Sequence, residues 1–428
     1  MRGPDSRCHA VPTRLVRRQA YGTHIELCEV PEPRGDCKGM VRRRRHRRGV
    51  AEAARIAGDG LMSWIALSDL SNPAFNLRGI GVPRNAPRAR GPMMQHEILP
   101  RGSLMIEFRA NAEPDKPQSI LNFRREYKWL REIRIALDAG GRITLEFLQG
   151  RARSQAVIDV TPPPRDTRCR LTYAWHAPQR VARLTVELID EGRIFQTNAY
   201  DPVPIPAVDV KAIMRNGKAT TVSKDVEFLA FSDEIEPIGF SNGIVGGTPV
   251  ETTNGPVPVE KLRLGDMVVT ATAGPQPVRW IGKRRVPALG GLRPVRVRAP
   301  FFGLSRDVLL APAHRVRLGV AEAEYMLGED EVLLAAGRLV DGRQALGEAR
   351  QRLVTYHQIL LDVHDCLLHD GLWAESMFVG TIARRPEMVK STVLAEMPIS
   401  AIPIHRSFAG TRLTDTESRN LVAALAAG

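Results

Sequence analysis

Hydrophobic and polar positions alternate with a period of two through much of the first half of the chain. In residues 104–109, Leu, Ile and Phe alternate with Met, Glu and Arg, a pattern typical of a β-strand with one buried face. Residues 133–137 and 143–147 have strand patterns and flank Asp138-Ala139-Gly140-Gly141, where glycine supplies the positive φ of a tight turn. These residues therefore predict an antiparallel hairpin.

Similar strands follow at short intervals up to about residue 240. They are expected at 156–160, 171–175, 181–189 and 226–231. Many short strands, separated by turn signals every roughly 8–12 residues, are typical of an antiparallel sandwich. We therefore predict an all-β domain over residues 62–238.

The strand pair within residues 170–190 resembles a hairpin of the concanavalin-like (laminin G-like) jelly rolls, in which a tryptophan, a turn and a second strand follow one another. The resemblance implies a jelly-roll-like sandwich with a carbohydrate as partner, often bound with calcium. Trp175 and His176 could line a sugar platform, although a tryptophan on such a strand more often packs in the core, which we favour. No cluster of Asp and Asn is dense enough for the about six to eight oxygen ligands of calcium.

From Phe240 onward the chain carries a different series of motifs. In order they are GTPVETTNG (247–255), VEKLRLGDMVVT (259–270), QPVRWIG (276–282), LAPAHRV (310–316) and YHQILLDVHDCLLHDGLWAES (356–376). The first motif is typical of a short strand followed by a tight Asn-Gly turn, and the second is typical of a Gly-Asp bend that leads into another strand.

These five motifs, in this order, resemble the Hint (hedgehog/intein) domain in its bacterial stand-alone form. The resemblance implies an all-β horseshoe over residues 239–380, in which the first residue meets an active-site histidine. It also implies self-cleavage, with the protein's own junction as substrate. A Cys or Ser at the first position attacks the preceding carbonyl, and the histidine protonates the departing nitrogen.

On this sequence the resemblance assigns the histidine to His314 and the nucleophile to Gly243. Glycine has no side chain and cannot attack, and Ala311 replaces the hydroxyl residue that usually accompanies the histidine. We therefore expect a Hint domain related to autoprocessing proteins, with impaired cleavage. His364 and Asp362 are expected as further members of the site.

Three readings of the junction remain open. The domain could be a structural or binding module that has lost processing. Ser241 could act as a displaced nucleophile. Asn242 could cyclise onto its own carbonyl and release Gly243, because glycine removes the steric block to this reaction. The alternative function is a non-catalytic adhesive or glycan-binding protein in which the Hint part is architecture.

We predict no metal and no cofactor. His364, Cys366 and His369 have a spacing compatible with zinc, but alternating His and Cys on a strand more often pack against neighbours. Neither GxGxxG after a strand nor GxxxxGK[ST] is present, so no nucleotide site is expected. His357 is expected to be structural, and the role of Glu375 and Ser376 cannot be derived from the sequence.

The net charge of +14 is concentrated in residues 1–61, with its densest run at Arg42–Arg45. This segment lacks apolar periodicity, so we expect a disordered basic tail or a misplaced start before Met62. A basic tail without a folded basic face argues against nucleic-acid binding. No apolar run reaches the about 20 residues of a membrane span, and no signal peptide is seen. We expect a soluble protein whose localisation and export route stay unassigned. Residues 381–428 are predicted as an extension with a helix capped by Thr414 or Asp415.

Overall fold

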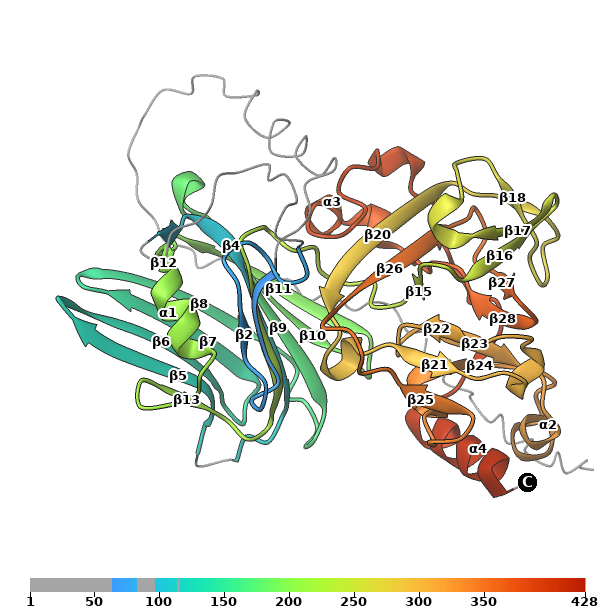
Figure 1. Ribbon diagram of the computed structural model, residues 1–428, viewed down its shortest axis with the longest axis horizontal. Coiled ribbons are helices and arrows are strands. Elements are labelled where there is room, and N and C mark those ends of the chain that lie inside the picture. The colour runs from blue at the N-terminus through green and yellow to red at the C-terminus, as the bar shows by residue number, and fades with distance from the viewer. Residues whose placement is uncertain (1–63, 83–96, 114–115, 428) are drawn as a thin grey trace, which may run out of the picture.

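The computed structural model describes residues 64–82, 97–113 and 116–427, which form two lobes of β-sheet that lie side by side (Figure 1). The named strands pair antiparallel except for one short parallel pair, and the last helix is short, so the predicted all-β class is confirmed. The predicted tail at 1–61 lies outside the described residues. No helix in the described part of the chain is long and apolar enough to cross a membrane.

The N-terminal lobe consists of two large sheets packed face to face and a small two-stranded sheet formed by Ile98–Leu99 and Ile205–Pro206. Its elements are β1 (Trp64–Ser68), β2 (Ala74–Phe75), β3 (Ile98–Leu99), β4 (Arg101–Arg109), β5 (Gln118–Tyr127), β6 (Trp129–Leu137), β7 (Arg142–Gln149), β8 (Ala152–Asp159), β9 (Arg168–His176), β10 (Val181–Leu188), β11 (Arg193–Tyr200), β12 (Ile205–Pro206), α1 (Ala207–Ile213), β13 (Thr220–Val222) and β14 (Val226–Ser232). The first sheet has the order β11-β10-β9-β4-β14-β1-β2 and the second β13-β5-β6-β7-β8.

The predicted hairpin is the β6–β7 pair, in which Ile133 lies opposite Phe147. Its turn needs glycine at 141, because φ is +86° and a Cβ there would lie 2.3 Å from the carbonyl oxygen of Val160. Between the sheets, Phe147 stacks on Tyr173 and Tyr173 stacks on Trp175. Trp175 is fully buried, as favoured from the sequence, so it offers no sugar platform.

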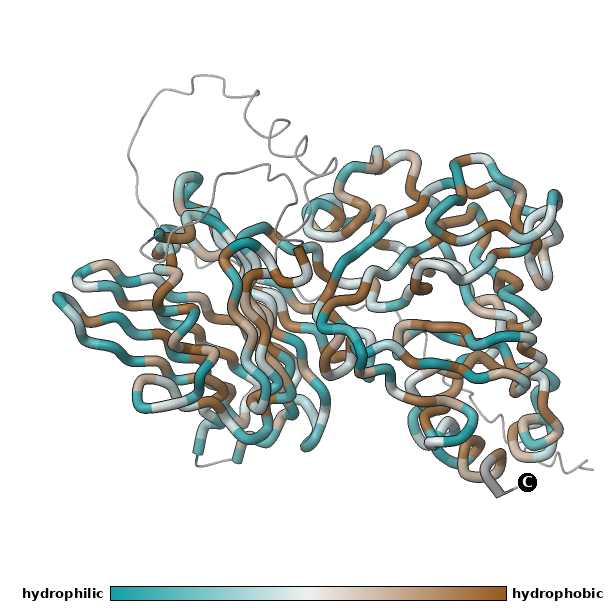
Figure 2. The backbone as a smooth tube through the Cα atoms, viewed as in Figure 1, coloured by the Kyte–Doolittle hydropathy of each residue, from teal (hydrophilic) through white to brown (hydrophobic). Residues whose placement is uncertain are grey.

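Strand β4 corrects one prediction. Its period of two predicted a strand with one buried face, yet the outward-facing Met105 and Glu107 are fully buried as well. The reason is that the outer face of the first sheet packs against the C-terminal lobe. Met105 belongs to a hydrophobic cluster that includes Phe228 of β14 and Tyr356 of the other lobe. Figure 2 shows hydrophobic stretches along these central strands.

The C-terminal lobe contains the elements from residue 244 onward. They are β15 (Ile244–Val245), β16 (Pro249–Thr252), β17 (Gly255–Pro258), β18 (Met267–Val268), β19 (Gln276–Pro277), β20 (Trp280–Pro287), β21 (Val295–Val297), β22 (Val308–Leu310), β23 (Arg315–Leu318), α2 (Ala321–Leu327), β24 (Val332–Ala335), β25 (Ala345–Gly347), β26 (Leu353–Leu360), β27 (Cys366–His369), β28 (Leu372–Glu375), α3 (Pro386–Val389), β29 (Thr411–Arg412) and α4 (Asp415–Ala427).

Three sheets of this lobe surround one hydrophobic core. Their orders are β20-β26-β15-β22-β21-β25, β17-β16-β18-β19 and β27-β28-β23-β24-β29. The two-residue strand β15 lies between β22 and β26, since Ile244 pairs with both Leu310 and His357. The residue before it, Gly243, is therefore held in the middle of a sheet.

The C-terminal extension is part of this lobe. Strand β29 adds to the third sheet parallel to β24, and Leu421 of α4 is buried in the core of the lobe. Helix α4 begins after Thr414, whose hydroxyl accepts from the Glu417 N–H at 3.3 Å, while the Glu417 carboxylate accepts from the Thr414 N–H at 2.7 Å. This reciprocal capping box identifies Thr414, one of the two predicted caps.

Polar contacts also join the lobes. The Trp64 indole donates to the carbonyl oxygen of Arg285 at 2.9 Å. Glu107 is buried and accepts from the Arg170 Nη2 at 2.9 Å and from the Gly291 N–H of the other lobe. The Arg170 Nη1 in turn donates to the hydroxyl of Ser241 at 2.8 Å. We call Glu107, Arg170 and Ser241 the inter-lobe ion cluster.

Candidate functional site

The peptide bond between Asn242 and Gly243 lies against His314. The Gly243 N–H donates to the His314 Nδ1 at 3.1 Å, and both residues are buried. His314 follows β22 and precedes β23, and its own N–H donates to the carbonyl oxygen of Ala311 at 3.0 Å, which fixes the turn that carries the ring. The structure therefore places the His314 imidazole against the Asn242–Gly243 peptide bond, as the sequence analysis expected.

Burial keeps the His314 imidazole neutral. Desolvation lowers its pKa to about 4, and the carboxylate of Glu375 only partly opposes this shift. In the neutral ring the Nδ1 accepts from the Gly243 N–H, so the single N–H proton of the ring lies on Nε2. A proton donor to a departing amine at Gly243 would need the proton on Nδ1. At neutral pH this histidine is thus set to bind the amide, not to protonate it.

Gln358 of β26 contacts the other end of the same peptide bond. Its Nε2 donates to the carbonyl oxygen of Asn242 at 2.9 Å and also to the carbonyl oxygen of Phe240. The side-chain Oδ1 of Asn242 lies 3.5 Å from the same nitrogen. Sequence reasoning missed Gln358. Its position next to His357, on the strand that pairs with β15, is the signal that could have found it.

Position 243 has no space for a side chain. A Cβ there would lie 2.7 Å from the Cβ of Tyr356 and 3.2 Å from the carbonyl oxygen of His357. The φ of Gly243 is +153°, at the border of the region that favours glycine. A cysteine or serine would therefore require β26 to move.

A second group of polar residues lies beside His314. Glu375 accepts from the Arg315 N–H at 3.1 Å and from the Arg315 Nη1 at 3.0 Å, and its carboxylate lies 3.6 Å from the His364 Nε2. The Arg315 charge and the His364 hydrogen bond outweigh burial and lower the pKa of Glu375 to about 2. Sequence reasoning could assign no role to Glu375. The structure makes it the buried carboxylate of this group.

Two of the sequence-predicted positions lie elsewhere. Asp362 is half exposed and accepts from the Arg279 Nε at 2.7 Å, so the structure does not place it with His314. Ser241 lies in the inter-lobe ion cluster, where its hydroxyl accepts from Arg170. His364 does join the group, because its Nε2 lies 3.6 Å from the carboxylate of Glu375.

Cys366 and His369 are buried on β27. Burial raises the pKa of the Cys366 thiol to about 12 and lowers the pKa of His369 to about 4. The His369 Nδ1 lies 2.8 Å from the carbonyl oxygen of Pro249, a structural contact. Among the described residues, no group of three or more His, Cys, Asp and Glu side chains is arranged to hold a metal ion.

The fold and the junction together define an all-β chain in which a buried histidine contacts the backbone between two lobes. Residues 243–381 match the family model of the Hint domain, which supports a Hint domain in this part of the chain. The match covers less than half of the chain. No curated protein matches the sequence.

Three solved structures share slight similarity with this chain. The carbohydrate-binding module CBM40 of the Ruminococcus gnavus IT-sialidase has 14% identity and a TM-score of 0.24, over 32% of this chain and 77% of that chain. The LG1–3 region of the laminin alpha2 chain has 10% identity and a TM-score of 0.22, over 67% and 54%. The enzymatically active domain of tailspike protein 2 of bacteriophage CBA120 has 7% identity and a TM-score of 0.19, over 31% and 19%. These similarities are too slight to specify a ligand for this chain.

Proposed function

We propose that the Hint domain of this chain binds its own upstream junction but does not cleave it by acyl shift. Two groups that contact a scissile peptide bond are in place: His314 at the nitrogen and Gln358 at the carbonyl oxygen. The group that would start the reaction is absent at Gly243. The domain then works as a structural module that holds the segment joining the two lobes.

One observation carries this proposal: position 243 cannot accept a side chain without displacing Tyr356. A lost nucleophile could be restored by one substitution if its space were still open. Here the Cβ of Tyr356 and the carbonyl oxygen of His357 occupy that space. The neutral state of His314 supports the same conclusion, because an acyl shift needs a proton donor at the departing nitrogen.

The contacts at the junction give less support to the remaining routes to cleavage. The Ser241 hydroxyl is bound to Arg170, and the buried Cys366 has a raised pKa. Asn242 is the strongest competitor, since Gln358 and His314 contact the two atoms that its cyclisation would polarise and release. Its side-chain nitrogen would attack its own carbonyl carbon and leave a C-terminal succinimide, with Gly243 as the new amino terminus.

Mass spectrometry of the intact protein tests the proposal. The purified chain should remain a single species after several days at neutral pH. Two fragments broken between residues 242 and 243 would overturn it. In that case an N-terminal fragment one water lighter than the hydrolysed form, lost in an Asn242→Ala variant, would assign the break to cyclisation.

A Gly243→Cys variant tests the steric argument. It should show no cleavage with dithiothreitol, and it should be less stable than the parent. The matched control is Gly246→Cys, where the added Cβ would meet no atom closer than 3.6 Å. Thiol-dependent cleavage at residue 243 in the first variant, absent from the control, would contradict the proposal.

As a second function we propose that the N-terminal lobe binds carbohydrate. Exposed aromatic side chains at one end of its sandwich favour this function: Tyr127, Trp129 and Tyr200 are each between 47% and 63% exposed. Aromatic rings that lie partly in water are suited to ligands with an apolar face and polar edges. A glycan array probed with the full chain tests it, and the absence of binding to any glycan would contradict it.

A further inference from the structure

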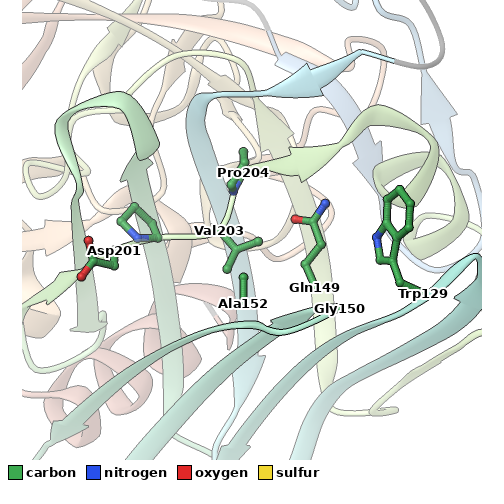
Figure 3. Close-up of a pocket in the computed structure, with 8 residues that line it drawn as sticks. Trp129, Gln149, Gly150, Ala152, Asp201, Val203 and Pro204 are labelled. Atoms are coloured by element: carbon green, nitrogen blue, oxygen red, sulfur yellow. The ribbon is translucent and has the colours of Figure 1, made fainter.

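A pocket of about 510 Å³ opens at one end of the N-terminal sandwich. It lies between the strand ends of the second sheet and the segment that follows β11, from Asp201 to Pro204. Figure 3 shows the Trp129 and Gln149 side chains rising from the sheet, with Val203 and Pro204 on the segment beside them and Asp201 at the far end. The pocket is thus a space between the two sheets that the core does not fill.

The strand register explains why Trp129 is exposed there. Residues Ile133 and Ile135 of β6 point into the core, and the period of two places Trp129 on the same face. The core ends before it reaches this position, so the ring remains 47% exposed. Gly150 lies beside the ring: a Cβ there would be 3.8 Å from the Trp129 Cγ. The Arg131 guanidinium lies over the ring, with its central carbon 6.0 Å from the ring centroid, and the rest of the exposed indole forms a wall of the pocket.

The polar groups of the pocket can bind hydroxyl groups. Gln149 makes no side-chain hydrogen bond to the described residues, so its amide can both donate and accept. It extends from the same face of the sheet as Trp129 (Figure 3). Val203 and Pro204 supply the apolar part of the opposite side. An apolar pocket with a few placed polar groups is typical of a small-ligand site.

The charges of the pocket disfavour an acidic ligand. Among the described residues that line it, Asp201 alone is charged, and its carboxylate already accepts from the Arg180 Nε. The nearby guanidinium of Arg131 is paired with Asp209 at 2.6 Å. No uncompensated cation among the lining residues would therefore meet a ligand carboxylate.

From these observations, and resting on the carbohydrate-binding function proposed above, we infer that the pocket binds one neutral sugar unit. The sugar places its C–H face on the indole of Trp129 and its hydroxyl groups against the amide of Gln149. Sialylated glycans are bound more weakly than their neutral counterparts, because the only charge that lines the pocket is a carboxylate.

A glycan array that holds neutral oligosaccharides and their sialylated forms, probed with the full chain, tests this site. The Trp129→Ala variant should lose at least tenfold in affinity for the glycans that the parent binds, and Gln149→Ala should lose several-fold. The matched control is Tyr325→Ala, which removes an aromatic ring that is 93% exposed on α2 of the other lobe. It should bind as the parent does. Circular dichroism should show both pocket variants folded, since each side chain lies partly in water.

Each result separates the two proposals. No binding by the parent chain overturns the carbohydrate function and the site with it. Unchanged binding by Trp129→Ala overturns this site and leaves the function standing. Preference for the sialylated forms overturns the neutral sugar as ligand.

Discussion

His314 belongs to a set of buried histidines that the fold keeps neutral. Desolvation lowers the pKa of His314, His369 and His405 to about 4. Each can therefore act as a hydrogen-bond acceptor at neutral pH. In the case of His314 this state satisfies the Gly243 N–H, which would otherwise be a buried donor without a partner.

These histidines predict that acid destabilises the fold. The unfolded chain binds their protons near pH 6.5, whereas the folded chain binds them near pH 4, so their contribution is lost as pH falls through that window. Buried Glu236, with its pKa raised to about 7, opposes the loss because its contribution grows below pH 7. Each of these histidines alone lowers the free energy of unfolding by roughly 2 kcal/mol between pH 7 and pH 5, and buried Glu107 and Asp209, whose pKa burial also raises, oppose this loss as Glu236 does.

Urea denaturation at the two pH values measures this difference. A His369→Gln variant should reduce the loss of stability between pH 7 and pH 5 by roughly 2 kcal/mol, whatever the variant does to stability at pH 7. The same difference between the two pH values in variant and parent would contradict the assignment of a neutral buried His369.

At the residue scale, the sequence predicted the residues that occupy a position in the Hint motifs. It could not predict contacts that depend on how the backbone packs. The motif order led to His314 and to the missing side chain at Gly243. It could not indicate that Tyr356 fills the space at 243, since that contact depends on how β15 enters the sheet. Asp362 was expected at the site because the Hint resemblance places late polar residues near this position, but the chain turns it outward to Arg279.

At the scale of single elements, helix α4 shows how a short end segment is fixed. Its thirteen residues would be marginal alone, so the cap and the buried Leu421 must stabilise it against the core of its lobe. The cap could be predicted from Thr414 and the following acidic residues. The pairing of β29 with β24 could not, because a two-residue strand has no period to detect.

A Thr414→Ala substitution should lower the free energy of unfolding by about 1 kcal/mol, because it removes the hydroxyl that accepts from the Glu417 N–H. Thermal denaturation checks the change. Thr414→Ser keeps the hydroxyl and should retain most of the stability. An equal loss in both variants would show that the methyl group, not the cap, is what matters.

At the scale of the whole molecule, the two lobes share both a hydrophobic cluster and buried charges. The pattern of β4 predicted a strand with one face in water. A period of two shows which face of a strand is more apolar, but it does not show whether another part of the protein covers the opposite face. The buried Met105 and Glu107 reveal the second lobe instead. The domain boundary predicted near residue 238 thus separates two sequence patterns, but the two parts that it separates pack against each other.

This interface predicts that the lobes unfold together, in a single calorimetric transition. Arg170→Met should lower the free energy of unfolding by about 3–5 kcal/mol, because it removes the buried guanidinium that donates to Glu107 and leaves this buried carboxylate only the Gly291 N–H and the more distant Arg168. The control is Arg142→Met, which breaks the exposed pair with Asp159 and should change the free energy of unfolding far less. Two separate transitions in the parent protein would show that the interface does not couple the lobes.

The hydrophobic cluster formed by Trp64, Phe228 and Tyr356 also limits how such a chain can be recombined. Grafting residues 243–381 behind a different upstream protein would leave the Tyr356 side of the graft exposed to solvent, and a sandwich produced alone would expose Phe228. Each half would then tend to aggregate unless its new neighbour presented a matching surface. The Hint part of this protein therefore cannot be transferred to another protein alone, and it needs its upstream lobe with it.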